Sequence, residues 1–414
     1  MQHIIPPQIN REQFLRDLDA LRQIGLQSDG AVHRVAYSSA DLEARRWLKR
    51  RLTDLGLTPL DDAAGNTLGV YAGSDPLPSI AIGSHTDTVP MGGAYDGALG
   101  VVAALAVIEA LNAAGVRLRH PIELINFAAE EATMGGGTTG SQAIAGIFKL
   151  ATLDKRAWDG RLVREHLQGA GLEPEVIISA ERAPNSFAAF LELHIEQSKQ
   201  LETTGKQIAV VDSFVGIRRY AIRFDGQANH AGTTPMAERR DALLMAAPMI
   251  QFVNDMAVEL GIVGTIGSFN VYPGAPNVIP ERVELVVEIR GPDVTILDEA
   301  RGLVFQQAKK LGGSAETIVE KPPVASDAII MQSIRQACDK LGLSTHDMSS
   351  GAGHDAMNMG LLCPTGIFFV PSKDGISHSK DEFTSAEDCV NGAQVYLEAV
   401  IALDQLLTGG ILVD

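Results

Sequence analysis

The 414-residue sequence has few cysteines and no long uninterrupted apolar run. Cys338, Cys363 and Cys389 form no CxxC pair, so neither a disulfide framework nor a zinc-thiolate site is indicated. The longest apolar stretch, ALGVVAALAVIEAL, is interrupted by Glu109 and is too short for a membrane span. The opening MQHIIPPQIN lacks a basic region followed by an apolar segment, so we expect no signal peptide. A reducing cytoplasm fits these features best.

Positive charge is also scarce. Lys and Arg together number 34 against 51 Asp and Glu, which gives a formal net charge of −17 at pH 7. Binding to phosphates requires clusters of Lys and Arg, and an anionic membrane would repel such a chain, so we expect neither nucleic acid nor a membrane as a partner. With 45% hydrophobic and 21% charged residues, the composition is that of a soluble globular protein. The length favours two or three domains.

Two common kinds of enzyme site are missing or weakly indicated. The chain contains no GxSxG motif, and its cysteines have no neighbouring histidine in sequence, so no nucleophile for covalent acyl transfer is visible. The stretch GAGHDA, residues 351–356, matches the glycine pattern of dinucleotide-binding loops. It follows the polar STHDMSS, where we expect no strand, and this argues against a dinucleotide site.

The pattern of apolar residues predicts an α/β fold. Residues 11–57 contain two amphipathic helical segments. Short strand-like runs then alternate with helices, namely LGVYAG, SIAIGS, a helix after Gly97, and PIELINFAAEE. Such alternation is typical of a mostly parallel sheet with helices on both faces.

A second, smaller domain is expected from residue 212 onward. There the chain changes to amphipathic strands and helices in the order β-α-β-β-α, which predicts a compact α+β insert of the split βαβ type at residues 212–327. The α/β pattern resumes after KPPVASD, with the strand-like GIFFVPS. The first domain is therefore predicted to be discontinuous, with residues 1–211 and 328–414 on either side of the insert.

Five side chains at the ends of predicted strands have the chemistry of metal ligands: His85, Asp96, Glu131, His194 and His378. Imidazole and carboxylate ligands suit zinc, and also manganese, cobalt or nickel. Five ligands can hold two metal ions if one carboxylate bridges them. Asp96 is the natural bridge, because it lies between other ligands in sequence and is flanked by glycines at 92, 93 and 97, which allow close approach of the backbone.

Acidic residues beside the ligands suggest further roles. Glu130 and Glu131 follow an apolar strand, and successive strand residues point in opposite directions. Glu131 is therefore assigned to the metal, and Glu130 remains free as a general base for a water molecule. Asp87 lies two residues after His85 and would orient its imidazole. Alternation in FLELHIEQ places His194 on the polar face of a strand.

Each of these residues also has an ordinary interpretation. Loop histidines usually face solvent, Glu-Glu pairs usually lie on solvated faces, and an Asp before Gly usually belongs to a turn. The joint occurrence of all five groups at strand ends in one domain favours a metal site. Spacing alone leaves both interpretations open.

Several motifs, in this order and over most of the chain, resemble one known family: GSHTDTVPMGGAYDGALG, NFAAEEA, LELHIEQSKQLE, NHAGTTPMAERRDAL, PNVIP, SGAGHDAMNM and SHSKDEF. The sequence is similar to the dinuclear metallohydrolases of the amidase, hydantoinase and carbamoylase group. This group includes N-carbamoyl-L-amino-acid hydrolase, allantoate amidohydrolase and β-ureidopropionase, and is related to carboxypeptidase G and the aminoacylases.

The resemblance implies roles for individual residues. One metal would be held by His85, Asp96 and His194, and the other by Asp96, Glu131 and His378, with Glu130 as the base. The related peptidases carry a carboxylate at the position of His194. The substrate would be contacted by Gln197, at its ureido or amide group, by a carboxylate clamp of Asn277 and Arg290, and by Gly353. His230 would reach from a second subunit to stabilise an oxyanion, which implies a homodimer.

The expected function is metal-dependent hydrolysis of the C–N bond of a small N-carbamoyl or ureido acid, with an N-carbamoyl-L-amino acid as first choice. Alternatives are allantoate, β-ureidopropionate, an N-acyl amino acid or dipeptide, and a catalytically dead homologue. One departure concerns the substrate pocket. Relatives usually carry EEG and then an Arg-Phe pair, whereas this chain reads EEATMGGGTTG, so the loop at 132–140 leaves the side-chain preference open.

Overall fold

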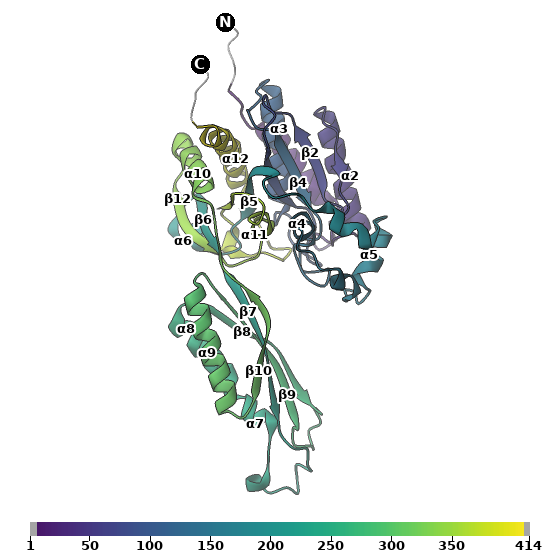
Figure 1. Ribbon diagram of the computed structural model, residues 1–414, viewed down its shortest axis with the longest axis vertical. Coiled ribbons are helices and arrows are strands. Elements are labelled where there is room, and N and C mark those ends of the chain that lie inside the picture. Colours follow the sequence, from purple (N-terminus) through teal and green to yellow (C-terminus); the bar gives the residue numbers. More distant parts are fainter. Residues whose placement is uncertain (1–5, 410–414) are drawn as a thin grey trace. The chain divides into compact units, whose positions relative to one another are not determined.

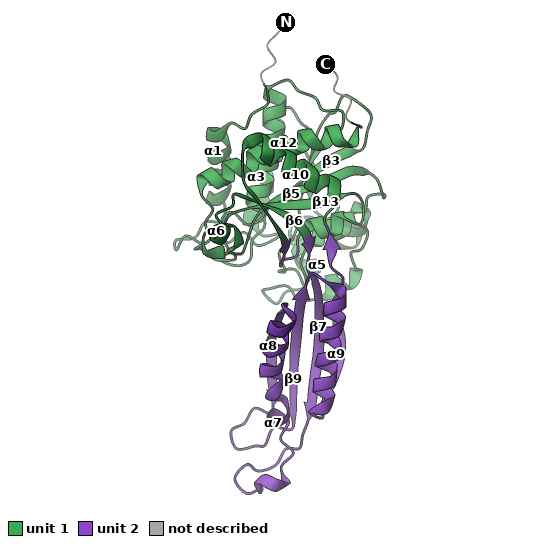
Figure 2. Ribbon diagram, turned by 90° about the vertical axis from the view of Figure 1, so that its left-hand side faces the viewer, with its two compact units in different colours: residues 1–212, 326–348, 354–414 green, residues 213–325, 349–353 purple. Residues whose placement is uncertain are grey.

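The computed structural model describes residues 6–409, which form two compact units (Figure 2). The larger unit contains the chain up to residue 212, residues 326–348 and the chain from residue 354, and the smaller unit contains residues 213–325 and 349–353. The boundaries expected from the sequence lie within two residues of these, and the structure adds 349–353 to the smaller unit. Residues 1–5, within the stretch where no signal peptide is expected, lie outside the described residues.

A nine-stranded sheet forms the centre of the larger unit. Its strands are β1 (Leu60–Asp61), β2 (Thr67–Tyr71), β3 (Ser79–His85), β4 (Ile122–Phe127), β5 (Phe187–Ile195), β6 (Ile208–Phe214), β11 (Val324–Ala325), β12 (Thr345–Ser350) and β13 (Thr365–Val370). The order is β1-β2-β4-β3-β5-β13-β6-β11, with β12 paired to β6. The neighbours β4, β3, β5 and β13 run parallel, which confirms the predicted parallel sheet at its centre. The pairs β1-β2, β2-β4 and β13-β6 are antiparallel.

Helices flank this sheet (Figure 1). They are α1 (Arg11–Gln23), α2 (Ser39–Asp54), α3 (Ala98–Ala113), α4 (Thr139–Ile144), α5 (Val163–Gly169), α6 (Gln200–Thr204), α10 (Ala328–Leu341), α11 (Asp355–Met359) and α12 (Ala386–Leu407). Short 3₁₀ turns lie at Leu150–Asp154, Pro174–Ala180, Met236–Glu238 and Lys373–Gly375. Helix α3 is buried along nearly its whole length, as expected for a helix that is apolar on all sides. It packs with α12 and the central strands in one core.

Two sequence expectations need correction. The polar segment Thr345–Ser350 forms strand β12, although no strand was expected there. It pairs only with the peripheral strand β6, so it does not need the apolar composition of a central strand. The second correction concerns Glu130 and Glu131, which lie in the loop after β4 ends at Phe127, so the alternation of a strand does not separate their side chains.

The smaller unit is an antiparallel four-stranded sheet with helices on one face (Figure 2). Its elements are β7 (Gly216–Asp225), α7 (Ala242–Ala246), α8 (Pro248–Leu260), β8 (Val263–Tyr272), β9 (Arg282–Gly291), α9 (Val294–Lys310) and β10 (Ser314–Lys321). The strand order is β10-β7-β9-β8. The predicted α+β insert is confirmed, and β10 completes it as a fourth strand that the polar SAETIVEK did not reveal. Every second residue of β9 is buried against the helices, from Val283 to Ile289.

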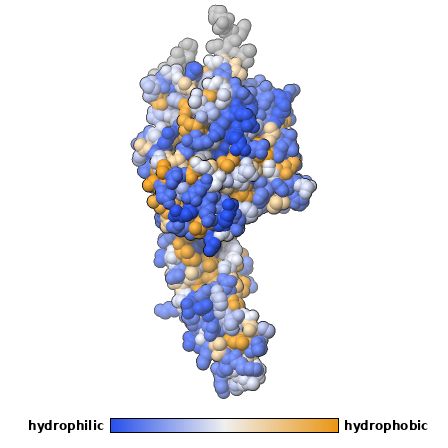
Figure 3. All heavy atoms as spheres, turned by 90° about the vertical axis from the view of Figure 1, so that its right-hand side faces the viewer, coloured by the Kyte–Doolittle hydropathy of each residue, from blue (hydrophilic) through white to orange (hydrophobic). Residues whose placement is uncertain are grey.

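One stretch, Ala242–Leu260, is long and apolar enough by length and composition to cross a membrane. In the structure this stretch is α7 and α8, and Met249, Val253 and Met256 pack into the core of the smaller unit. Core helices of soluble proteins pass the same test of length and composition, so this is weak evidence for a membrane span. The molecular face drawn in Figure 3 is mostly hydrophilic, with apolar groups in small areas.

Candidate metal centre

All five candidate metal ligands come from the carboxyl ends of neighbouring parallel strands or from the loops that follow them. His85 is the last residue of β3, and Asp96 lies between β3 and α3. His194 is the second-last residue of β5, Glu131 follows β4, and His378 follows β13. Since β4, β3, β5 and β13 are adjacent in the sheet, their carboxyl ends meet at one edge, where open α/β sheets bind ligands.

The ligand atoms form two groups that share Asp96. One group is His85, Asp96 and His194, and the other is Asp96, Glu131 and His378, with the ligand atoms of each group within 4.8 Å of one another. Asp96 Oδ1 lies 3.4 Å from His85 Nε2 and 3.2 Å from His194 Nε2. Its Oδ2 lies 3.4 Å from His378 Nε2, which is also 3.3 Å from Glu131 Oε1. Each oxygen of Asp96 thus faces one group.

Glu130 belongs to neither group but lies beside the first. Its Oε2 is 3.6 Å from His85 Nε2, and its side chain is nearly buried. Burial raises the pKa of the Glu130 carboxyl well above its usual range, although the charge of His85 acts in the opposite direction. A buried carboxyl group with a raised pKa next to a candidate metal pair is a candidate general base. Its assignment as the base stays a prediction.

Charges within the cluster strongly shift the pKa values of the candidate ligands. Burial by itself raises the pKa of Asp96, but the charge of His194 and hydrogen bonds from the histidines hold it well below its usual range. Hydrogen bonds to Asp96 and Glu131 raise the pKa of His378 to about 11. Asp96 and the histidines around it therefore stabilise each other's charged forms. A set of such ligands is suited to exchange its protons for divalent cations.

Asp87 contacts both His85, as expected for a residue that orients its imidazole, and the loop that follows β4. The carbonyl oxygen of Asp87, at 3.0 Å, is the nearest partner of His85 Nδ1, while the Asp87 carboxylate is 3.6 Å away. The carboxylate instead accepts hydrogen bonds of 3.2 Å from the backbone amides of Glu130 and Glu131. Asp87 therefore fixes the loop that carries both glutamates, and it contacts His85 through its carbonyl oxygen and, at a longer distance, through its carboxylate.

Gln197 lies directly against the shared ligand. Its Nε2 donates to Asp96 Oδ2 at 2.7 Å, and its Oε1 is buried without a hydrogen-bond partner among residues 6–409. A buried acceptor without a partner leaves a place for a donor from a bound molecule. The backbone of Gln197, of His378 and of Ala129, just before Glu130, adopts positive φ angles of 57°, 55° and 52°. Such backbone strain in non-glycine residues is concentrated at functional sites.

Glycines allow the loops to close around the cluster. Gly97 has a φ of 61°, and a Cβ there would overlap the ring of His85. In the glycine-rich loop after Glu131, a Cβ at Gly137 would lie 2.6 Å from the carbonyl oxygen of Glu130. The amide of Thr138 donates to that same carbonyl at 2.6 Å. The EEATMGGG loop thus folds back onto the backbone of the predicted base.

Three buried groups near the cluster had no role in the sequence interpretation. His354 is 3% exposed, and its ring centroid lies 4.7 Å from that of His194. Asp355 accepts a hydrogen bond from Ser141, and Glu192 accepts from Ser84 Oγ and from the amide of Ala356. Burial raises the pKa of both carboxyls. The only sequence signal for them was the His-Asp pair after a glycine turn and the polar face of FLELHIEQ.

The predicted substrate residues of the smaller unit are not gathered at one place within that unit. His230 and Asn277 are neighbours. The amide of Ala231 donates to the carbonyl of Asn277 at 3.0 Å, and His230 and Val278 form an isolated antiparallel β-bridge. Arg290 lies near the other end of β9, where its Nη1 donates to the Gly351 carbonyl at 2.9 Å, two residues before Gly353. From Arg282 to Arg290 a strand extends roughly 27 Å. One chain therefore cannot bring Asn277 and Arg290 to the same small carboxylate.

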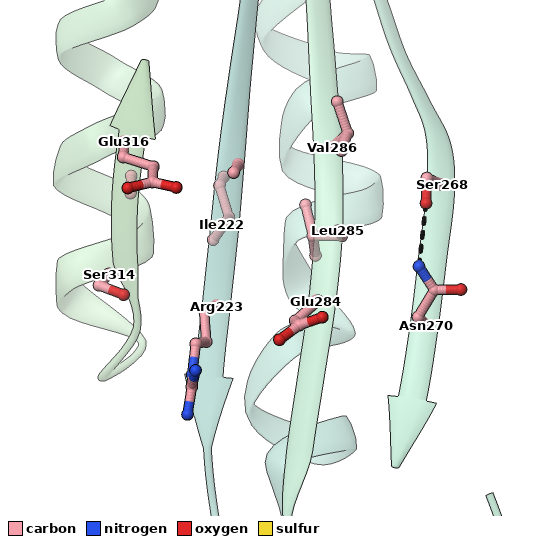
Figure 4. Close-up of a pocket in the computed structure, with 11 residues that line it drawn as sticks. Ile222, Arg223, Ser268, Asn270, Glu284, Leu285, Val286, Ser314 and Glu316 are labelled. Atoms are coloured by element: carbon pink, nitrogen blue, oxygen red, sulfur yellow. Dashed lines mark hydrogen bonds between the residues drawn. The ribbon is translucent and has the colours of Figure 1, made fainter. Parts of the chain in front are cut away.

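A hollow of about 560 Å³ on the open face of the four-stranded sheet offers no comparable chemistry. A row of polar side chains crosses the strands there: Ser314, Arg223, Glu284 and Asn270 (Figure 4). Arg223 is paired with Asp225 at 2.8 Å, and Glu284 with Arg282 at 3.3 Å. Exposed pairs of this kind contribute little to stability.

The fold and the cluster define the class of the protein. An α/β unit that places histidines and carboxylates around one shared aspartate at the carboxyl ends of its strands, with a glutamate beside them, is the arrangement of a metal-dependent hydrolase. Residues 81–402 match peptidase family M20/M25/M40, and the chain belongs to this family.

Relatives of known name cover nearly the whole chain. An N-carbamoyl-L-amino acid amidohydrolase of Geobacillus stearothermophilus is 36% identical over 406 residues, which are 96% of this chain and 99% of the relative. An allantoate amidohydrolase of Bacillus subtilis is 32% identical and covers 93% and 96% of the two chains. Among solved structures, an amidase of the hydantoinase/carbamoylase family from Burkholderia multivorans has a TM-score of 0.85 at 33% identity, and covers 96% and 98%. The family resemblance drawn from the motifs is confirmed.

Proposed function

We propose that this protein is a dinuclear metal-dependent amidohydrolase that cleaves the C–N bond of N-carbamoyl-L-amino acids. The observation that carries the proposal is the position of Asp96, whose two oxygens face two separate groups of ligands. The donor set of imidazoles and carboxylates fits Zn²⁺, Mn²⁺, Co²⁺ or Ni²⁺. His85 and His194 would complete one metal site with Asp96, and Glu131 and His378 would complete the other.

Bound divalent ions in such a site polarise a substrate carbonyl and make a water molecule more acidic. Glu130 is the group of this chain that takes a proton from the attacking water, because its carboxylate is free of both ligand groups and only 3.6 Å from His85. The same carboxyl then returns a proton to the leaving nitrogen. Gln197 is placed beside Asp96 with a free acceptor, Oε1, for an N–H of the ureido or amide group.

The remaining contacts require a second copy of the chain. Asn277 and His230 lie beyond one end of β9, and Arg290 lies near the other, so two chains are needed to supply all three to one substrate. In this arrangement Arg290 and Asn277 hold the substrate carboxylate, Gly353 lies near Arg290, and His230 in trans stabilises the oxyanion.

The smaller unit has a surface suited to pairing. Strand β8 is an edge strand, and exposed strand edges are natural templates for pairing with another chain. Nearby apolar side chains are exposed, with Leu244 at 70%, Val258 at 76% and Val263 at 62%. We therefore propose a homodimer in which residues 212–327 act as lid and dimerisation domain.

The relatives support a ureido substrate over a peptide. One of them is named for N-carbamoyl-L-amino acids and another for allantoate, which is the leading alternative. His194 stands where the related peptidases carry a carboxylate, which also weighs against peptides. β-Ureidopropionate, N-acyl amino acids and dipeptides remain further alternatives. The net charge of −17 and the three buried, unpaired cysteines support a cytoplasmic enzyme without nucleic acid or membrane partners.

The test is ammonia release by protein reconstituted with Zn²⁺, Mn²⁺, Co²⁺ or Ni²⁺. The panel contains N-carbamoyl-L-amino acids, allantoate, β-ureidopropionate, N-acyl amino acids and dipeptides. We expect ammonia from N-carbamoyl-L-amino acids, because a terminal ureido group liberates it and a dipeptide does not. Ammonia from allantoate alone would move the assignment to the alternative. Cleavage of dipeptides with no turnover of any ureido compound would overturn the substrate class.

A further inference from the structure

One buried carboxylate outside both ligand groups connects the two loops that carry Asp96 and His378. Glu382 lies four residues after His378, between β13 and α12, and is only 5% exposed. Its Oε1 accepts hydrogen bonds from the backbone amides of Tyr95, at 2.7 Å, and of Asp96, at 3.0 Å. Two consecutive amides converging on one oxygen fix the backbone of the shared ligand.

The second oxygen of Glu382 is linked to the side chain of Asp96 through the hydroxyl group of Ser377. Ser377 Oγ lies 3.0 Å from Glu382 Oε2 and 2.7 Å from Asp96 Oδ2. A hydroxyl has one hydrogen, so Ser377 donates to one of these carboxylates at a time. Ser377 directly precedes His378, and the contact therefore links the backbone beside one ligand to the side chain of another.

The backbone around Asp96 is shaped to admit Glu382. Gly93 lies three residues before Asp96, and a Cβ at this position would overlap the carboxylate of Glu382. The φ of Gly93 is not in the left-handed region, so an alanine there would act through this contact and not through backbone strain. Only a residue without a side chain at position 93 therefore leaves room for the carboxylate of Glu382.

We propose that Glu382 is a positioning residue that holds the shared ligand Asp96 in register with His378 and thereby sets the affinity of the metal centre. The inference rests on the metal centre of the proposed function. Groups that hydrogen-bond to metal ligands commonly change metal affinity or activity by about 10- to 100-fold when removed. Glu382 differs from such partners in binding the backbone of one ligand and the neighbour of another.

The test measures metal binding to the full-length protein. Apoprotein prepared with a chelator is titrated with Zn²⁺ or Mn²⁺ by calorimetry, for wild type, Glu382→Ala, Glu382→Gln and the control Asp381→Asn. Asp381 is adjacent in sequence, its side chain is 62% exposed, and it forms an ion pair with Lys380. We expect Glu382→Ala to weaken metal binding about 10- to 100-fold, and Glu382→Gln to weaken it less, because an amide oxygen still accepts both backbone hydrogens. Asp381→Asn should match wild type.

Gly93→Ala supplies an independent variant that leaves Glu382 in place. It should weaken metal binding as Glu382→Ala does, and the double variant should bind metal no more weakly than Glu382→Ala alone, since the smaller side chain removes the overlap. The melting temperatures of the apoproteins show whether a variant loses metal affinity because it unfolds or because Asp96 is displaced. Metal affinity within about twofold of wild type in Glu382→Ala and Gly93→Ala, with only the melting temperature lowered, would overturn the proposal. A wild-type protein that binds no divalent ion would instead overturn the metal centre itself.

Discussion

The two units of this protein present their candidate functional residues in opposite ways. In the larger unit His85, Asp96 and His194 are at most 5% exposed, and each has charged neighbours that shift its pKa. In the smaller unit His230 and Asn277 are exposed on loops. The difference teaches that one chain brings together both candidate groups of metal ligands and the predicted base, but leaves the predicted substrate contacts apart.

The largest effect is expected at Glu130, the predicted base in the larger unit. Glu130→Gln removes the proton acceptor without touching either ligand group, so kcat should fall on the order of 10³-fold while metal content stays as in wild type. The measurement is steady-state ammonia release together with metal analysis of the purified protein. Glu131→Gln is the matched comparison, because removal of a ligand should reduce metal content as well. Full turnover of Glu130→Gln with bound metal would show that the base is another group.

The next effect tests whether the smaller unit acts in trans. His230→Ala should lower kcat about 10²- to 10³-fold, because it removes a donor to the developing oxyanion. Mixing this variant with Glu130→Gln, after dissociation and reassociation, should restore about a quarter of wild-type activity, since half of randomly formed dimers contain one intact site. Sedimentation confirms the dimer in each sample. If the mixture stays inactive although mixed dimers form, His230 does not act across the subunits.

A smaller effect is expected for substrate binding by Arg290. Arg290→Ala should raise KM on the order of 10- to 100-fold with a minor change in kcat, because a hydrogen-bonded ion pair with the substrate carboxylate is lost. Arg290→Lys should recover part of this loss. Arg223→Ala on the open face of the same sheet is the control, since Arg223 forms an ion pair with Asp225 and its loss should leave both constants unchanged. Equal KM values for Arg290→Ala and wild type would remove Arg290 from the site.

The smallest expected effect is the change of metal affinity for each unit of pH. Without metal, Asp96 and Glu131 raise the pKa of His378 to about 11, so this histidine is protonated at neutral pH. A metal ion must displace that proton, and metal affinity should therefore rise with pH, by about tenfold per unit for each proton released. Calorimetry between pH 6 and pH 8 in buffers of different ionisation enthalpy counts the protons. Affinity that does not change with pH would show that the ligands bind metal without losing a proton.

The sequence was most informative where composition and structure agree. The apolar runs of β3 and β4 and the all-apolar α3 were predicted because central elements must bury both faces. The polar strands β10 and β12 were missed because they lie at the periphery, where the hydrophobic pattern carries little information. The candidate ligands could also be found, since His85 and His194 lie at recognisable strand ends and Asp96 lies in the glycine-rich loop that follows β3.

The sequence by itself thus determined most of the order of elements, the candidate ligands and, through its motifs, the family. Only the tertiary structure decided which oxygen of Asp96 faces which group, that Asp87 holds the glutamate loop, and that His354 and Glu382 lie at the cluster. The separation of Asn277 from Arg290 likewise became visible only along the folded length of β9. The physical reason is that local sequence fixes secondary structure and residue type, whereas contacts between loops far apart in the chain depend on how the strands pair.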